Sequence, residues 1–297
     1  MALNEEKFES IPDPARTMEG LRDTGYDFRT AIADLVDNSI AAHAKTINIQ
    51  VNMGYKGEIR VLITDDGDGM DREALLDAMR YGSPRRPNPA SLGKYGLGLK
   101  TASTAFCKRL SVISRNNGAG PAQMATWDID HVMKTGKWEL LFSQEPDEEA
   151  LKHLNILAPD KPGTVVLWSK VDRIFGKAYQ DPGGGFAKRA LDKKLGELQE
   201  HLGEVYQRFL DTSDKRAPNV TIRVNGKKVE PWDPFQIAVS ELLAQQEVTV
   251  PIGENQNAEF TVKAYVLPRR EEFPNDELAK AAKISSERQG IYIYREN

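Results

Sequence analysis

The chain has 297 residues, enough for two domains of ordinary size. Hydrophobic residues make up 40% of the chain and charged residues 28%, which is an ordinary globular composition. The net charge of −4 excludes an overall basic field that would attract nucleic acid, although local basic patches are compatible with it.

The sequence shows no sign of a membrane or secreted protein. No apolar run approaches the roughly 18 residues of a membrane helix, and the N-terminus lacks the basic and apolar regions of a signal peptide. The single cysteine, Cys107, excludes an internal disulfide and indicates a reducing compartment. We therefore expect a cytoplasmic protein in which Cys107 is structural.

The first part of the chain is predicted to form helices followed by many strands. Helical spacing and alternating or continuous apolar runs indicate the two kinds of element. In chain order, these are a short helix through Met18 and Leu21, a helix over 26–42, strands over 46–51 and 59–63, helices over 71–80 and 97–106, and strands over 110–114, 124–129, 138–142 and 163–168. This order predicts an α+β fold, a two-layer sandwich, over a first domain of residues 1–175.

The second part begins after Asp181-Pro-Gly-Gly-Gly185, which indicates a linker. Apolar residues at helical spacing between Leu191 and Phe209 predict a long amphipathic helix. Strands are expected at 220–224, 248–250, 260–266 and 291–294. We assign residues 186–297 to a smaller α+β domain, and we expect it to be cut off at its C-terminal end.

Asp34 and Asn38 lie one turn apart on the predicted helix over 26–42, so their side chains are stacked on one face. An asparagine can offer a neutral oxygen to Mg²⁺, and an aspartate can orient or deprotonate an attacking water. Taken alone, this stretch is better explained as the polar face of a solvated helix.

The loop Asp65-Asp-Gly-Asp-Gly-Met70 follows a strand that is predicted to be buried. An aspartate at a strand end can accept a hydrogen bond from an amine such as that of adenine, and glycines let the backbone approach a flat ring. An acidic turn is the alternative. A calcium loop is excluded, because the acidic spacing and the closing glutamate are missing.

Gly93, Gly96 and Gly98 form a glycine-rich loop before a predicted helix. Backbone N–H groups and a helix N-terminus favour phosphate there. The loop is neither a Walker A loop nor a dinucleotide-binding fingerprint, because the lysine motif and the preceding strand are absent. Gly163-Thr164 opens a buried strand and has no specific meaning by itself.

The four motifs together, in this order over residues 34–164, resemble the GHKL superfamily of ATPases. That superfamily includes gyrase-type topoisomerases, heat-shock chaperones, MutL and sensor histidine kinases. The segments 31–39, 92–100 and 290–295 are most similar to microrchidia (MORC) type ATPases. The resemblance implies a Bergerat ATP-binding fold for the first domain and a transducer-like second domain.

The resemblance also implies binding of ATP with Mg²⁺ and a role for each motif residue. Asn38 would bind Mg²⁺, and Asp34 would activate the attacking water. Asp65 would hold the adenine amine, with Thr164 beside it. Other residues would line the base (Gly67, Gly69 and Met70) or form the lid over the phosphates (Gly93, Lys94, Tyr95, Gly96, Leu97, Gly98, Leu99 and Lys100).

Asp34 stands where hydrolysing relatives usually carry glutamate, which is one methylene longer. Two hypotheses follow: a slow ATPase that dimerises on ATP binding, or a nucleotide-binding module without significant turnover. The absence of a histidine before residue 30 argues against a sensor kinase. DNA is a partner that the resemblance also allows, in a machine related to DNA or to chaperoning, but it does not name the client.

Overall fold

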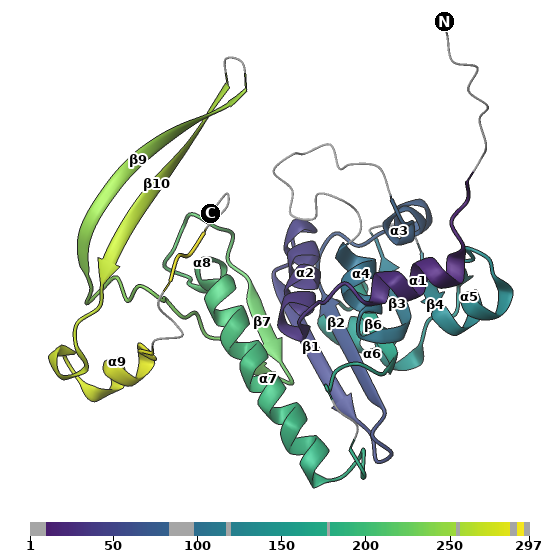
Figure 1. Cartoon of the computed structure of the whole chain (residues 1–297). Coiled ribbons are helices and arrows are strands. Elements are labelled where there is room, and N and C mark those ends of the chain that lie inside the picture. The colour runs from purple at the N-terminus through teal and green to yellow at the C-terminus, as the bar shows by residue number, and fades with distance from the viewer. Residues whose placement is uncertain are drawn as a thin grey trace, which may run out of the picture.

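The computed structural model describes residues 10–82, 98–116, 120–176, 179–253, 256–285 and 290–293. Its largest unit is an eight-stranded sheet with strand order β5-β4-β3-β6-β2-β1-β7-β8, packed against helices (Figure 1). The predicted α+β class is therefore confirmed. Within the described residues, none of the helices is both long and apolar enough to cross a membrane.

The helices and strands have the following bounds. The helices are α1 Pro14–Arg22, α2 Phe28–Ala41, α3 Arg72–Met79, α4 Gly98–Thr104, α5 Ile129–Thr135, α6 Glu148–Leu157, α7 Gly185–Val205, α8 Gln207–Leu210, the 3₁₀ helix η1 Arg270–Glu272 and α9 Asp276–Ala281. The strands are β1 Thr46–Met53, β2 Ile59–Asp65, β3 Cys107–Arg115, β4 Gln123–Asp128, β5 Leu141–Ser143, β6 Gly163–Val171, β7 Thr221–Val224, β8 Lys227–Lys228, β9 Glu241–Gly253 and β10 Gln256–Val266.

Both faces of the large sheet are covered. Val61 and Ile63 of β2 point into a core that they share with α1, α2, α4 and α7. Leu62, between them, points to the opposite face, where it packs with Ala150 and Leu154 of α6. Because successive side chains of a strand alternate between faces, a strand covered on both sides has a continuous apolar run, as β2 does.

Helix α2 begins at Phe28, two residues into the predicted segment, because Asp27 caps it. The Asp27 side chain accepts a hydrogen bond from Arg29 N at 2.8 Å, which satisfies one of the unpaired donors of the first turn. Asp71 caps α3 in the same way through Ala74 N, at the start of the helix predicted over 71–80. These caps fix where the two helices start.

Several elements differ from the sequence-based expectations. The strand predicted over 124–129 ends at Asp128, whose carboxylate caps α5. Helices α5, α6 and α9 are absent from those expectations. Residues 291–293 form no strand, and Tyr292 packs its ring against Phe235 instead, while Tyr294 lies outside the described residues.

The segment after the predicted linker contributes to the same sheet and core. β7 pairs in parallel with β1, and α7 packs its apolar stripe, from Leu191 to Leu202, into the core shared with α2. The hairpin of β9 and β10 forms a second sheet that projects from this body (Figure 1). A boundary between two domains near residue 186 stays a prediction.

Candidate functional site

Three neighbouring strands of the large sheet place polar side chains side by side. Thr164 of β6 lies opposite Asp65 of β2 on one side and opposite Ser114 of β3 on the other. Asp65, Thr164 and Ser114 all point to the face that α2 covers, because they share the two-residue phase of the apolar side chains on that face. A polar patch thus interrupts the core where these strands meet α2.

Asp65 is the acid of this patch, and only 4% of its surface is exposed. Its Oδ2 accepts a hydrogen bond from Ser39 Oγ of α2 at 2.9 Å, and its Oδ1 accepts one from Gly67 N at 3.0 Å. Burial raises the pKa of Asp65 to about 6, and the two hydrogen bonds oppose that rise. A backbone hydrogen bond from Thr164 opposes it as well, and the carboxylate retains acceptor capacity toward a further donor.

Thr164 is tied to the same patch through Ser114. The hydroxyl oxygens of Thr164 and Ser114 lie 2.8 Å apart, and Met70 N donates to Ser114 Oγ at 2.8 Å. The structure therefore brings together Asp65, Met70 and Thr164, which come from separate parts of the sequence. Sequence reasoning missed Ser39 and Ser114, because a lone serine in a helix or strand carries no local signal.

Gly67 and Gly69 are required by the packing of the loop itself. A Cβ on Gly67 would lie 2.6 Å from Ala42 O, and one on Gly69 would lie 1.9 Å from Arg115 O. Gly69 also has a positive φ of 65°, which favours glycine. These contacts explain both glycines without a ligand, so their predicted role in lining a base stays a prediction.

Asp34 and Asn38 lie one turn apart on the half-buried face of α2, as predicted. Asn38 Nδ2 donates to Asp34 O at 2.9 Å. A Cβ on Gly98, the first residue of α4, would lie 3.5 Å from Asp34 Oδ2. The structure thus places Asp34 against the start of the helix that follows the predicted lid.

Asn38 has the donor chemistry of a magnesium ligand. Because its Nδ2 is used by the helix backbone, its Oδ1 is directed elsewhere, and no hydrogen bond to it is found within the described residues. Nor does that part of the chain hold a group of three or more histidine, cysteine or acidic side chains that could bind a metal. One amide oxygen fits Mg²⁺, which usually keeps waters and phosphate oxygens as ligands.

The predicted lid is described only in part. Gly93, Lys94, Tyr95, Gly96 and Leu97 lie outside the described residues. Leu99 is half-buried against the core. Lys100 is 1% exposed, donates to Ala78 O at 2.7 Å and lies over the ring of Tyr81. In this arrangement the Lys100 ammonium is held at the end of α3, and its predicted contact with phosphates stays a prediction.

Asp37, the other acid of this part of α2, is engaged by the residue that follows α7. Tyr206 donates to Asp37 Oδ1 at 2.6 Å and lies 2.8 Å from Ala33 O. Burial raises the pKa of Asp37. This contact links α7 to α2, and it explains the half-buried Asp37 without a catalytic role.

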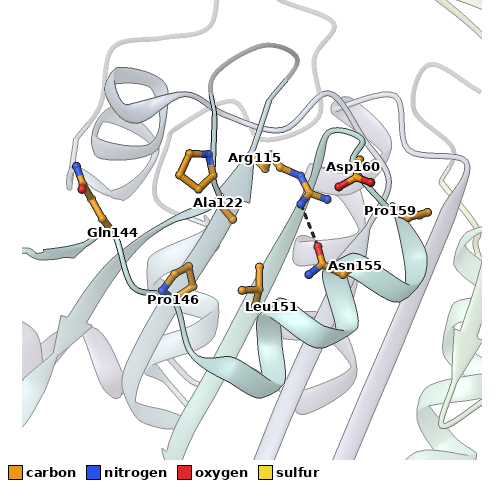
Figure 2. A pocket seen from close by; sticks show the side chains of 9 residues that line it. Arg115, Ala122, Gln144, Pro146, Leu151, Asn155, Pro159 and Asp160 are labelled. Atoms are coloured by element: carbon orange, nitrogen blue, oxygen red, sulfur yellow. Dashed lines mark hydrogen bonds between the residues drawn. The ribbon is translucent and has the colours of Figure 1, made fainter.

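A hollow of about 520 Å³ is lined by a different set of residues (Figure 2). It is bounded by Arg115, which donates to Asn155 Oδ1 of α6 at 2.9 Å, and by proline and apolar side chains. None of the predicted site residues lines it. We therefore locate the candidate site by its converging polar side chains rather than by this hollow.

Comparison with known proteins matches the part of the chain that holds these motifs. Residues 26–164 match the family described as histidine kinase-, DNA gyrase B-, and HSP90-like ATPase. The DNA mismatch repair protein MutL of Rhodospirillum rubrum is 36% identical over 101 residues, which are 33% of this chain and 16% of that protein. Protein MICRORCHIDIA 6 of Arabidopsis thaliana is 31% identical over 91 residues, which are 29% of this chain and 14% of that protein.

A longer match is found with MutL of Methanocorpusculum labreanum. It is 25% identical over 204 residues, which are 67% of this chain and 30% of that protein. The chain therefore spans less than a third of the length of each of these relatives.

Proposed function

Through residues 26–164 this chain belongs to the histidine kinase-, DNA gyrase B- and HSP90-like (GHKL) ATPases, and we propose that it binds ATP with Mg²⁺ and hydrolyses it slowly. ATP would act as a conformational switch that closes the lid and brings two copies of the chain together. The similarity to MutL and MICRORCHIDIA proteins supports work in a DNA-associated machine.

The observation that carries the proposal is the convergence of Asp65, Ser39, Thr164 and Ser114 at the ends of three strands and beneath α2. A buried carboxylate with two donors and remaining lone pairs is suited to accept a hydrogen bond from an exocyclic amine. The neighbouring hydroxyl groups offer both donors and acceptors to a ring nitrogen or to a bridging water. This combination favours adenine over a base that presents a carbonyl at that position.

On α2, Asn38 would hold Mg²⁺ through its amide oxygen, and Asp34 would orient the attacking water and accept its proton. The metal, when bound, neutralises charge on the phosphates and aligns them. Asp34 lies close to the start of α4, so lid closure would bring the phosphates and the water into its reach.

The first test is binding of ATP, ADP and a non-hydrolysable ATP analogue, with and without Mg²⁺, while mass is followed by light scattering. Mg²⁺-dependent binding with analogue-induced dimers is the expected result. Binding without dimers would contradict the proposed dimerisation and favour the alternative, a nucleotide-binding module. Failure to bind any of these nucleotides would overturn the proposal.

Turnover is expected to depend on Asp34. In Asp34→Asn the side chain no longer accepts a proton, so the rate of phosphate release should fall by about tenfold or more, while analogue affinity changes little. Asn also keeps the size of the side chain. If wild type and variant bind ATP and are equally inactive, the chain is a nucleotide-binding module, which is the alternative that aspartate in place of glutamate allows.

Nucleotide affinity is expected to fall with acid pH because of Asp65, whose pKa is raised to about 6. The ionised carboxylate accepts from the adenine amine, so protonation below that pH competes with binding. Affinity should be constant above about pH 7 and fall by up to about tenfold per pH unit below 6. Isothermal titration at several pH values measures this, and Asp65→Asn, which cannot titrate, corrects for protonation of the phosphates.

A further inference from the structure

Tyr26, which no motif singles out, contacts the proposed base directly. It lies just before α2, and its hydroxyl donates to Asp34 Oδ2 at 2.9 Å. Its ring is half-buried against the core of the large sheet. Burial, together with the hydrogen bond to Asp34 and the charge of Asp34, raises the pKa of Tyr26. The phenol is therefore a hydrogen-bond donor at every physiological pH.

Helix α4 completes the surroundings of this hydroxyl. Thr101 of α4 also hydrogen-bonds the Tyr26 hydroxyl. Gly98 lies beside Asp34 Oδ2, because a Cβ added to this glycine would be 3.5 Å from that oxygen. The Oδ2 atom is thus enclosed by Tyr26 and the first turn of α4. Within the described residues no hydrogen bond to Asp34 Oδ1 is found, so this oxygen can accept from another partner.

We infer that Tyr26 is a positioning residue for the proposed ATP hydrolysis: its hydroxyl fixes Asp34 Oδ2 so that Oδ1 faces the attacking water. The inference rests on the proposed function, because it assigns a role to a neighbour of the proposed base. Aspartate is one methylene shorter than glutamate, so its carboxylate reaches less far from α2. A hydrogen bond that holds it in one rotation restores the alignment that proton transfer needs.

The chain offers a matched control for this contact. Tyr206 donates to Asp37, three residues after Asp34 on the same helix, at 2.6 Å. That pair faces α7, and its hydroxyl is also 2.8 Å from Ala33 O, which makes it a packing contact. Both pairs consist of a tyrosine hydroxyl and an aspartate on α2, so either change to phenylalanine removes a hydrogen bond between a tyrosine and this helix.

The test compares Tyr26→Phe and Tyr206→Phe with the wild type. Tyr26→Phe should lower kcat for phosphate release by about tenfold, with the affinity for the non-hydrolysable analogue unchanged. Tyr206→Phe should lower the midpoint of thermal unfolding but leave kcat within about twofold. In an Asp34→Asn background, Tyr26→Phe should have no further effect on kcat, because the two residues act as a unit.

The outcomes separate this role from the proposed function. If the wild type turns over ATP and Tyr26→Phe does so equally fast, the positioning role is overturned and the ATPase proposal stands. If Tyr206→Phe lowers kcat as much as Tyr26→Phe, the loss reflects general loosening of α2, and the role is likewise overturned. A wild type that binds the analogue without turnover overturns both. 4-Aminophenylalanine at position 26 keeps a ring donor and should restore most of the rate; no restoration contradicts the inference.

Discussion

Asp65→Asn should weaken ATP binding by about 100-fold or more. Gly67 N donates to one carboxylate oxygen, so the asparagine must place its single oxygen there. Its Nδ2 then takes the place of Oδ2 and faces the adenine amine, a donor against a donor. The loss combines a hydrogen bond to a charged group with a buried donor left unpaired, which together cost about 3 kcal/mol. Isothermal titration with ATP measures the change.

Asp68→Asn is the control for this variant. Asp68 lies on the same loop, is exposed and pairs with His43 at 2.7 Å, away from the polar patch. Its removal should leave ATP affinity within about twofold, because an exposed pair contributes little. Equal binding by the wild type and Asp65→Asn would show that this carboxylate does not recognise the base.

The effect of Asp65→Asn on stability can be predicted separately from its effect on ATP binding. The pKa of Asp65 is about 6 in the folded chain, against 3.8 for an unperturbed aspartate, so the folded state binds more protons and stability falls as pH rises between these values. At pH 7 the buried charge costs on the order of 3 kcal/mol. Asp65→Asn removes this charge, so it should unfold no more easily than the wild type at pH 7. A strongly destabilised variant would invalidate the affinity comparison.

Gly69→Ala should lower the free energy of unfolding by about 3 kcal/mol or more. A positive φ costs a non-glycine residue about 1–2 kcal/mol. The added Cβ would also lie 1.9 Å from Arg115 O, so the loop or the end of β3 must move. That shift disturbs the Met70 N to Ser114 hydrogen bond next to it. Denaturant unfolding followed by circular dichroism measures the effect.

Gly136→Ala separates the two contributions. Gly136 also has a positive φ, of 63°, but a Cβ there would meet nothing within 4 Å. This variant should therefore lose only the backbone cost of about 1–2 kcal/mol. If both variants lose the same amount, the close approach of Arg115 O is relieved at no cost, and the loop is less constrained than its packing indicates.

The order of four short motifs is enough to predict the resemblance, and residues 26–164 match the family described as histidine kinase-, DNA gyrase B-, and HSP90-like ATPase. Apolar patterns are enough for four elements. Each of α2, α7 and β1 buries one regular stripe or face, and β2 is a continuous apolar run that is buried on both faces. The caps of α2 and α3 are also local, since Asp27 and Asp71 bond to residues two or three positions ahead. Such features depend on near neighbours in the chain, which a sequence shows directly.

Other parts of the fold could not be predicted in this way. Helix α6 escapes prediction although Asp147 caps it, because only Ala150 and Leu154 are buried, and they pack with Leu62 and Val165 on the second face of the sheet. The strand over 291–294 is predicted from the alternation of isoleucine and tyrosine alone, which says nothing about a partner strand. A strand needs a hydrogen-bonded neighbour, and in the described residues Tyr292 packs on an aromatic ring instead.

The sequence by itself indicated Asp34, Asn38, Asp65 and Thr164, but not Ser39 or Ser114, together with the loops and helix that carry them. Only the tertiary structure decided which atoms meet. The register of the strands places Thr164 between Asp65 and Ser114, and the packing of α2 on the sheet brings Ser39 within hydrogen-bond distance of Asp65. It also placed Tyr26 against Asp34 and turned Lys100 toward α3. The reason is physical, because hydrogen bonds and burial depend on distances between segments, and those distances are set by the packing of the whole core.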